Sequence, residues 1–196
     1  MKIGFLASHG GSNMQAIIDA CKSNKLNALP AVVISNNSKS TALERARSEN
    51  IPFYHISGVA YPDQDDLDRA IVEKLKLHDV DVVVLAGYMK KIGDRVIEAF
   101  PGRILNIHPA LLPKYGGKGM YGDYVHEAVL AAGDKVSGPT VHVVDGKFDH
   151  GRILSQREVP VLDGDTVETL SKRVLSEEHK IYWETLQKIV SGDIRL

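Results

Sequence analysis

Short apolar segments alternate with helical patterns along the first half of the chain. Strand-like runs are predicted at 3–7, 31–35, 53–56 and 80–86. Amphipathic helical patterns follow them at 12–23, 41–49, 67–78 and 93–100. The run at 80–86 is almost continuously apolar, which is typical of strands buried on both faces of a parallel sheet. Strands that alternate with helices form βαβ units, so we predict an α/β fold with a doubly wound, mostly parallel sheet and helices on both faces.

The second half of the chain adds a different pattern. A strand at 104–108 is followed by a helix at 125–132, and the β-branched runs 136–144 and 153–161 are joined by a short loop. Because a short loop joins antiparallel neighbours, we expect these two runs to extend the parallel sheet as an antiparallel pair. A long final helix is predicted at 166–191, with Gly192 ending it.

Three helix starts carry the signature of a capping box. Ser12 precedes Gln15, Thr41 precedes Glu44 and Asp165 precedes Glu168, each by three residues. A side-chain oxygen at the first position can accept a bond from the backbone of the third helical residue. We therefore predict Ser12, Thr41 and Asp165 as N-caps.

The totals exclude several classes of protein. The 196 residues carry a formal net charge of −1, which does not favour a general nucleic-acid or membrane binder. The single cysteine, Cys21, allows no internal disulfide and is typical of a reducing cytoplasm. The N-terminus enters a strand-like run directly, and no apolar run approaches the roughly 20 residues of a membrane span. We expect one cytoplasmic domain.

Two polar side chains stand at the end of the 104–108 strand. Asn106 and His108 point to the same face because side chains alternate along a strand, and Pro109 cannot continue the ladder. In open α/β sheets, ligands bind at the carboxyl ends of the strands. An asparagine amide can donate to a developing oxyanion, and a histidine can exchange protons near neutral pH. From these residues alone, a structural histidine explains the pattern equally well.

The turn after the first strand allows two interpretations. Gly10 and Gly11 precede a helix whose first N–H groups can bind an anion, which would make this turn a phosphate cradle. A tight turn without a ligand explains the same residues. Neither a P-loop nor a GxGxxG fingerprint is present. The histidines include no His-x-x-x-His pair, so no metal site is expected.

Several separated segments resemble one enzyme family. They are Asn106-Ile107-His108-Pro109-Ala110-Leu111-Leu112-Pro113, Gly138-Pro139-Thr140-Val141-His142, Asp149-x-Gly151 and Gln156-x-x-Val159-Pro160-Val161. With these motifs at their expected spacing, the chain resembles the formyltransferases that use 10-formyltetrahydrofolate. The members that act on glycinamide ribonucleotide are indicated by Gly11-Ser12-Asn13 with Gln15-Ala16-Ile17, by Leu85-Ala86-Gly87-Tyr88-Met89, and by Glu178-His179-x-Ile181-Tyr182. The resemblance covers essentially the whole chain.

The resemblance implies a fold and an activity. It implies one Rossmann-like formyltransferase domain over 1–196, with a nucleotide-phosphate-binding half (1–108) and a folate-side and C-terminal half (109–196). The enzyme would belong to purine biosynthesis and transfer the formyl group of 10-formyltetrahydrofolate to the amine of glycinamide ribonucleotide. The amine would attack directly, through a tetrahedral intermediate and without a metal. No nucleic acid or membrane partner is implied, and the chain would be a monomer or a weak homodimer.

The resemblance also implies residue roles. Asn106 would polarise the formyl oxygen, His108 would donate the proton, and Asp149 would tune His108 and help relay that proton. The substrate phosphate would bind at Gly11, Ser12 and Asn13, and its ribose at Glu178. The folate pocket would be lined by Asn106 together with Met89, Lys90, Lys91 and Ile92.

Four positions depart from the family pattern. Lys90 stands where arginine is common, Leu175 where a polar or basic phosphate contact is frequent, and Arg152 where proline is usual. We expect Arg152 to face solvent rather than the folate. The loop at 118–121 also differs from the common form, and His126 beside it is interpreted as a solvated helix residue.

Two alternatives remain at this stage. The first is a related formyltransferase or a formyltetrahydrofolate hydrolase. Hydrolases usually carry an extra N-terminal domain, and transferases acting on methionyl-tRNA or sugar nucleotides usually add a C-terminal one. The second alternative is a non-catalytic nucleotide-binding module, which the combination of Asn106, His108 and Asp149 disfavours.

Overall fold

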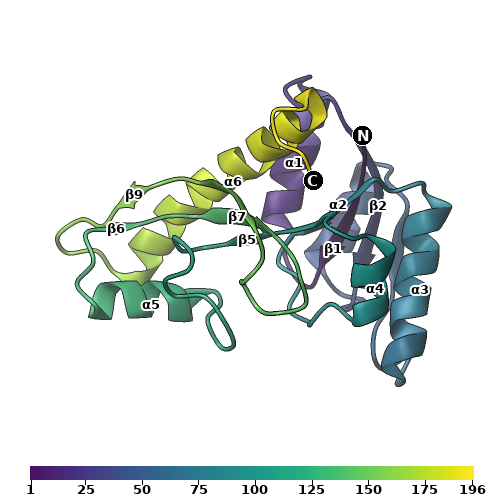
Figure 1. Cartoon of the computed structure of the whole chain (residues 1–196), viewed down its shortest axis with the longest axis horizontal. Coiled ribbons are helices and arrows are strands. Elements are labelled where there is room, and N and C mark those ends of the chain that lie inside the picture. The colour runs from purple at the N-terminus through teal and green to yellow at the C-terminus, as the bar shows by residue number, and fades with distance from the viewer.

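The structure is a computed structural model that describes residues 1–196 and contains six helices and nine strands (Figure 1). The helices are α1 (Ser12–Lys22), α2 (Thr41–Ser48), α3 (Gln64–Leu77), α4 (Asp94–Ala99), α5 (Asp123–Ala131) and α6 (Val167–Ser191). The strands are β1 (Lys2–Ala7), β2 (Leu29–Ser35), β3 (Phe53–His55), β4 (Val82–Leu85), β5 (Ile104–His108), β6 (Val136–Ser137), β7 (Thr140–Val143), β8 (Ile153–Gln156) and β9 (Val159–Pro160). None of the helices has the length and apolar composition that crossing a membrane requires.

A seven-stranded sheet in the order β3-β2-β1-β4-β5-β7-β8 forms the centre of the molecule. The first five strands in chain order pair in parallel, whereas β7 is antiparallel to both β5 and β8. The chain winds outward from β1 to β3 and then crosses to β4 on the other side of β1. The strand order therefore reverses between β1 and β4, and the predicted doubly wound sheet with an antiparallel extension is confirmed.

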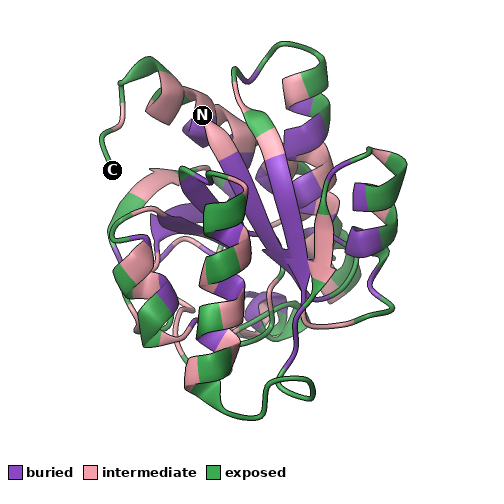
Figure 2. Ribbon diagram, turned by 90° about the vertical axis from the view of Figure 1, so that its right-hand side faces the viewer, coloured by how far each residue is buried: buried purple, intermediate pink, exposed green.

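Helices cover both faces of this sheet, and each face has its own apolar core. One core joins α1, α2 and α6 to alternate residues of β1 such as Ile3 and Phe5. The other joins α3 and α4 to the opposite face, through residues such as Leu6, Ile71 and Val96. Figure 2 shows the result as buried strands surrounded by helices with exposed outer sides.

The two runs expected to form long antiparallel strands are each divided in two. β6 and β7 are separated at Gly138 and Pro139, and β6 pairs with β9 in a separate two-stranded ribbon. Gly138 has a φ of 142°, and a Cβ atom there would lie 1.8 Å from the carbonyl oxygen of Arg157. Pro139 has no N–H to donate to a ladder. The glycine-proline pair therefore separates β6 from β7, opposite the gap at 157–158 between β8 and β9. Only β7 and β8 extend the main sheet.

The three predicted N-caps are wrong by one residue. The N-caps are Gly11, Ser40 and Thr166, so the residues predicted as caps either begin the helix or precede the cap. Gly11 adopts a left-handed φ of 66°, and a Cβ atom there would lie 2.9 Å from the Cβ of Ala42. Only glycine suits both conditions. Gly192 ends α6 in the left-handed conformation, as predicted.

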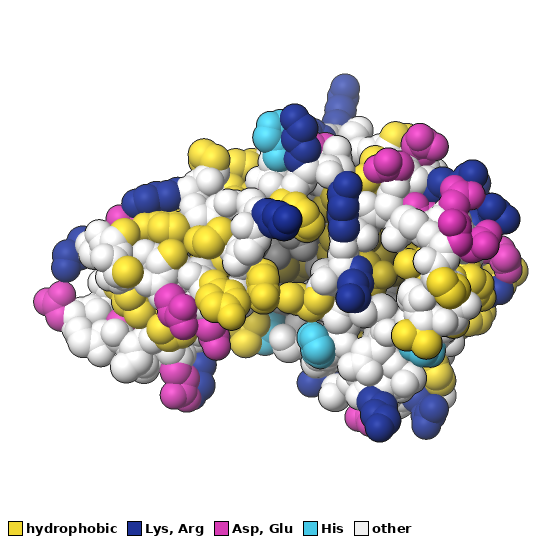
Figure 3. Space-filling view, turned by 90° about the horizontal axis from the view of Figure 1, so that it is seen from below, with side chains coloured by type: hydrophobic (Ala, Val, Ile, Leu, Met, Phe, Trp, Pro, Cys, Tyr) yellow, Lys and Arg dark blue, Asp and Glu magenta, His cyan; other side chains and the backbone are white.

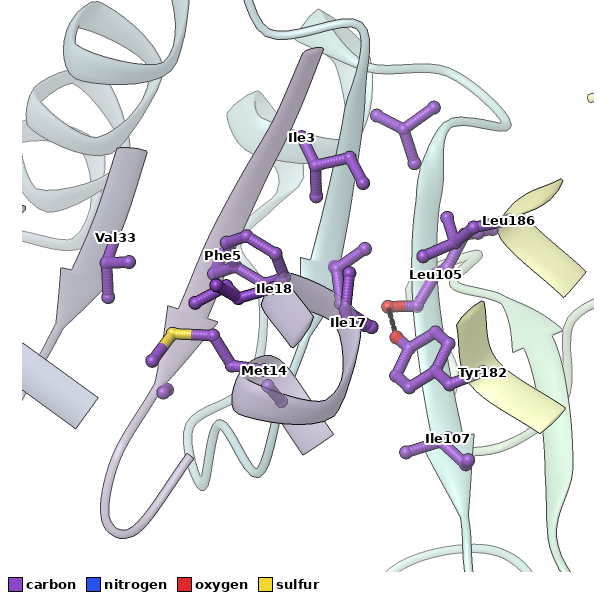
Figure 4. Close-up of a cluster of buried hydrophobic side chains, with 14 of the residues drawn as sticks. Ile3, Phe5, Met14, Ile17, Ile18, Val33, Leu105, Ile107, Tyr182 and Leu186 are labelled. Carbon is purple, nitrogen blue, oxygen red and sulfur yellow. Dashed lines mark hydrogen bonds between the residues drawn. The ribbon is translucent and has the colours of Figure 1, made fainter. Parts of the chain in front are cut away.

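Helix α6 is fastened to the sheet by a buried tyrosine. The hydroxyl of Tyr182 donates to the carbonyl oxygen of Leu105 in β5 at 2.9 Å (Figure 4) and to that of Leu85 in β4 at 3.1 Å. Tyr182 is fully buried, and burial raises the pKa of its hydroxyl well above the usual value, which keeps the donor proton in place. The same hydroxyl therefore ties α6 to the two strands that lead into the edge described below.

We expect Tyr182→Phe to destabilise the fold without changing its architecture. The substitution leaves two buried carbonyl oxygens without this partner, which typically costs about 1–3 kcal/mol. The free energy of unfolding in urea measures the loss. Tyr124→Phe, which removes the hydroxyl of an exposed tyrosine, is the matched control. Equal unfolding free energies for Tyr182→Phe and the control would contradict this account of α6.

Candidate active site

Two loops and one strand end meet at the carboxyl edge of the parallel strands. The turn after β1 leads into α1, the segment after β4 runs through 86–92, and β5 ends at His108. The reversal of strand order between β1 and β4 leaves the first two of these segments side by side, which is where α/β sheets bind ligands. Figure 3 views this edge from below, with Lys and Arg side chains around a hollow near its centre.

Asn106 is held by a histidine on the neighbouring strand. Asn106 in β5 pairs with His142 in β7, and the Asn106 amide nitrogen lies 3.1 Å from the His142 Nε2. The His142 Nδ1 lies 3.0 Å from the carbonyl oxygen of Val143, which can only accept, so Nδ1 carries the proton. The Nε2 lone pair then accepts from Asn106, and this bond fixes the amide nitrogen of Asn106 on the His142 side.

His108 lies between a carbonyl and a carboxylate. Its Nε2 lies 2.7 Å from the carbonyl oxygen of Tyr115, and its Nδ1 lies 3.5 Å from the Asp149 Oδ2. The other Asp149 oxygen is 3.6 Å from the His142 Nε2. The backbone N–H of Gly117 donates to Asp149 as well, at 3.0 Å. The structure therefore brings Asn106, His108 and Asp149 together, with His142 as a fourth member.

Opposing effects set the protonation of this cluster. Burial lowers the pKa of His108, and the Asp149 carboxylate and the Tyr115 carbonyl offset only part of that effect. Burial would raise the pKa of Asp149, but the contacts with His142, His108 and Gly117 outweigh it and hold that pKa below its usual range. At neutral pH the resting site therefore contains a neutral His108 and an ionised Asp149.

A second polar cluster lies at the start of α1. The Asn13 amide nitrogen donates to the Glu178 Oε2 at 2.6 Å, which joins residues 165 positions apart. Both side chains are buried, and the Asn13 Oδ1 has no hydrogen-bond partner. Burial raises the pKa of Glu178 although the Asn13 bond opposes it. Because Gly11 is the N-cap, the Ser12 hydroxyl makes no cap bond and stays available to a ligand.

A cavity of about 90 Å³ opens beside Asn106. Of the residues expected to line the folate pocket, Lys90, Lys91, Ile92 and Asn106 do line it. Met89 does not, and its backbone N–H donates to the Ser8 hydroxyl at 2.8 Å. The other residues that line the cavity are Leu85, Tyr88, His142, Val144, Gly146, Lys147, Phe148 and Asp149.

Two contributors to this site were not predicted from the sequence. His142 was noted only as part of a motif, although antiparallel pairing with β5 would have placed it opposite Asn106. The carbonyl of Tyr115 could not be predicted, because a backbone contact from a loop leaves no residue-type signal. No group of three or more His, Cys, Asp or Glu side chains is arranged to hold a metal ion.

The departures from the family pattern have different outcomes. Arg152 is exposed, as expected, and its guanidinium donates to the carbonyl oxygen of Arg195 at 2.6 Å. The interpretation of His126 as solvated is wrong, because it is 3% exposed and burial lowers its pKa. It lies on the inner side of α5, among its buried residues. Leu175 offers no charge, but the Arg45 Nε donates to the carbonyl oxygen of Gly10 at 2.9 Å.

Comparison with known proteins identifies relatives over the whole chain. The family model described as "Formyl transferase" matches residues 1–186. A chloroplastic phosphoribosylglycinamide formyltransferase of Arabidopsis thaliana is 44% identical over 99% of this chain, which spans 67% of that protein's length. The phosphoribosylglycinamide formyltransferase of Escherichia coli is 37% identical over 100% of this chain and 90% of its own length. The crystal structure of glycinamide ribonucleotide transformylase 1 from Symbiobacterium toebii superposes with a TM-score of 0.93, at 42% identity, and the match covers 100% of this chain and 90% of that one.

We expect Glu178→Gln to change how stability depends on pH. An unfolded glutamate titrates near about 4.3, whereas burial raises the pKa of Glu178 in the folded chain. In the wild type, Glu178 therefore makes its full contribution to folding stability below about pH 4, and this contribution is lost as the pH rises through the raised pKa. Urea unfolding should show Glu178→Gln gaining stability relative to wild type over that rise.

The neighbouring Glu177 gives a control with the opposite sign. The Lys180 bond, with a smaller effect of Arg157, holds the pKa of Glu177 below its usual range. Glu177→Gln should therefore lose stability relative to wild type as the pH rises, because the ionised carboxylate is the form these cations stabilise. Parallel stability profiles for wild type and Glu178→Gln would show that the Glu178 carboxyl is not desolvated.

Proposed function

This chain belongs to the formyl transferase family, and from that premise we propose that it transfers the formyl group of 10-formyltetrahydrofolate to the amine of glycinamide ribonucleotide, a step of purine biosynthesis. The observation that carries the proposal is the meeting of Asn106, His108 and Asp149 beside a cavity at the carboxyl edge. Asn106 and His108 share strand β5, and the fold brings Asp149 to them from a separate segment of the sequence.

The phosphate and ribose of the nucleotide substrate fit the start of α1. The first N–H groups of this helix are free to bind an anion at Gly11, Ser12 and Asn13. The Asn13 Oδ1 and one Glu178 oxygen remain available for ribose hydroxyls. Leu175 leaves the phosphate without a charged partner from α6, and Arg45, bonded to the Gly10 carbonyl, supplies positive charge beside the turn instead.

The folate fits the cavity beside Asn106. Ile92, Val144 and Phe148 provide apolar walls for a flat ring system, and Asp149 and Asn106 provide polar groups at one end. Lys90 and Lys91 also line the cavity, where an ammonium can attract the folate carboxylates as a point charge. Bound there, the folate supplies a formyl carbon attached to a nitrogen that can leave.

Each member of the cluster has a role that follows from its contacts. Asn106 donates an amide N–H to the formyl oxygen as negative charge develops, and the His142 bond holds that amide in orientation. A bond forms between the substrate amine and the formyl carbon, and the bond from that carbon to the folate nitrogen breaks. One proton leaves the amine and one joins the folate nitrogen, so the protein must carry a proton between them.

Neutral His108 is suited to carry that proton. It is 3% exposed and does not line the cavity, whereas Asp149 lines the cavity and lies 3.5 Å from its Nδ1. His108 takes up the amine proton by way of Asp149, which stabilises the resulting imidazolium, and then returns the proton to the leaving nitrogen. His108 is thus the proton donor of the second half of the reaction.

The wider setting completes the proposal. We place the whole range 1–196 in one formyltransferase domain, with the phosphate site in 1–108 and the folate side with the C-terminal part in 109–196. We further propose a cytoplasmic location, no metal requirement and a monomer or weak homodimer. Formyltetrahydrofolate hydrolysis is the competing activity, and a reaction without glycinamide ribonucleotide distinguishes the two.

We expect Asn106→Ala to lower kcat about 10²–10³-fold, which is typical for the loss of one oxyanion donor. His108→Ala should lower kcat about 10²–10⁴-fold, the usual contribution of a positioned acid or base. Formyl transfer to glycinamide ribonucleotide is the measurement, with His55→Ala at the exposed end of β3 as the control. The proposed function fails if wild type hydrolyses the folate in water and transfers no formyl group.

We expect Asp149→Asn to move the acidic limb of the kcat profile to lower pH as well as lowering kcat. The carboxylate raises the pKa of His108, so its loss lets that pKa fall further and keeps His108 neutral in more acidic solution. Saturating substrates are used, and the substrate amine titrates identically in every variant. Asp79→Asn is the matched control, because Asp79 has the same left-handed φ of 53° as Asp149 but bonds to Lys2. A limb that moves to higher pH would contradict the pairing of Asp149 with His108.

A further inference from the structure

One loop contacts both members of the proton-carrying pair through its backbone. The Tyr115 carbonyl accepts from the His108 Nε2 at 2.7 Å, and the Gly117 N–H donates to the Asp149 Oδ2 at 3.0 Å. Both backbone groups lie within three consecutive residues of the chain. A shift of this segment therefore changes the two contacts together.

The backbone of Tyr115 has an uncommon conformation. Its φ is 58°, in the left-handed region that bulky side chains rarely occupy, so the surroundings of Tyr115 must hold it there. Its phenol donates to the Asp134 Oδ2 at 2.8 Å. The same carboxylate accepts from the Lys114 Nζ at 2.6 and 2.8 Å, and that ammonium lies 4.9 Å from the centre of the Tyr115 ring. Asp134 thus anchors two consecutive residues.

Asp134 has a fixed place in the fold. It follows Gly133, which takes a left-handed φ of 69° directly after the C-cap of α5, and its backbone N–H is bonded to the carbonyl of Val129 in that helix. α5 in turn packs on α6 through Val129 and Leu170. A chain of contacts therefore runs from α5 through Asp134 and Tyr115 to His108.

We propose that Asp134 and Tyr115 are positioning residues for His108, the phenol-carboxylate bond holding the Tyr115 carbonyl against the imidazole. This inference rests on the proposed function, because it concerns the proton that His108 carries. Neither residue lines the cavity, so neither touches the folate there. Their effect on the reaction passes through the 115–117 segment and its contacts with His108 and Asp149.

The Tyr115 carbonyl matters most when His108 is charged. An imidazolium has two N–H groups, and here Asp149 faces one and the Tyr115 carbonyl faces the other. Asp149 and this carbonyl raise the pKa of His108, whereas burial and His142 lower it. His126, on α5, lies near enough for its charge and that of His108 to repel. Loss of the carbonyl contact therefore lowers the pKa of His108 and makes the proton harder to hold.

The experiment compares Tyr115→Phe, Asp134→Ala and Asp134→Asn with wild type. The pKa of His108 is measured by NMR titration of labelled imidazole without substrates, with His108→Asn assigning the signal. We expect Tyr115→Phe and Asp134→Ala to lower the pKa of His108 and to lower kcat about threefold to tenfold, a part of the roughly 10²–10⁴-fold effect of a positioned acid or base. The KM for each substrate should change by less than about twofold.

Two further variants make the result specific. Asp134→Asn keeps an oxygen that can accept from the phenol, so it should restore most of the kcat that Asp134→Ala loses. Asp163→Asn removes an exposed carboxylate that pairs with Lys135, the residue after Asp134, at 3.5 Å and makes no hydrogen bond to the 115–117 segment. This control should match wild type in both the pKa of His108 and kcat.

The outcomes separate this inference from the proposed function. An unchanged pKa of His108 in Tyr115→Phe and Asp134→Ala overturns the inference, whatever the activity. A raised KM with unchanged kcat overturns it too, because it would place the pair in substrate binding. If wild type transfers no formyl group while the pKa of His108 still falls in both variants, the proposed function fails and the structural link from Asp134 to His108 stands.

Discussion

The hydroxyl of Tyr182 determines where the last helix of the chain lies. It bonds to carbonyls of both β4 and β5, the strands that lead to the cavity wall and to Asn106. Four residues earlier on the same face of α6, Glu178 reaches Asn13 at the start of α1. Residues four apart lie one above the other on a helix, so a single docked turn of α6 fixes the proposed ribose end of the site relative to the proposed formyl end. The buried contact of Tyr182 thereby helps to fix the distance between Asn13 and Asn106.

A second contact joins the two loops at the strand-order reversal. The Ser8 hydroxyl donates to the Asn36 Oδ1 at 2.6 Å and accepts from the Met89 backbone at 2.8 Å. Ser8 belongs to the turn that leads to Gly11, and Met89 to the wall segment that follows β4. Because Ser8 uses the Met89 N–H, recognition in the cavity falls to the neighbouring residues and to the loop at 146–149. The proposed nucleotide and folate sites are therefore parts of one hydrogen-bonded edge.

The helices and strands could be predicted from the sequence more reliably than the residues at which they begin and end. The polar residues at the end of β5 could be predicted, whereas the contacts made by loops could not. Apolar periodicity is set by burial over many residues, so the sheet, its reversal and the positions of Asn106 and His108 followed from it. The exact first residues of the helices did not follow from it, because contacts between residues distant in sequence decide which residue is the N-cap. Ala42, for example, leaves no room for a Cβ atom at position 11, so that position requires glycine. The break at Gly138 likewise depends on the carbonyl of Arg157, a partner that periodicity cannot reveal. The prediction for His126 was wrong because this residue lies on the buried side of α5. The length of a predicted helix does not tell which of its sides faces the protein.

The cluster contains two imidazoles, those of His108 and His142, and one carboxylate, that of Asp149. The contacts of the two imidazoles decide which of them can take up a proton. Protonation of the His142 Nε2 would remove the lone pair that accepts from Asn106, because its Nδ1 proton is already bonded to the Val143 carbonyl. Asn106, the proposed oxyanion donor, would then lose the bond that orients its amide. Protonation of His108 breaks no bond, because its Nδ1 faces Asp149 and its Nε2 already donates to Tyr115. Asp149 can balance only one positive charge, so in the proposed mechanism the proton goes to His108, and the His142 Nε2 stays free to accept from Asn106.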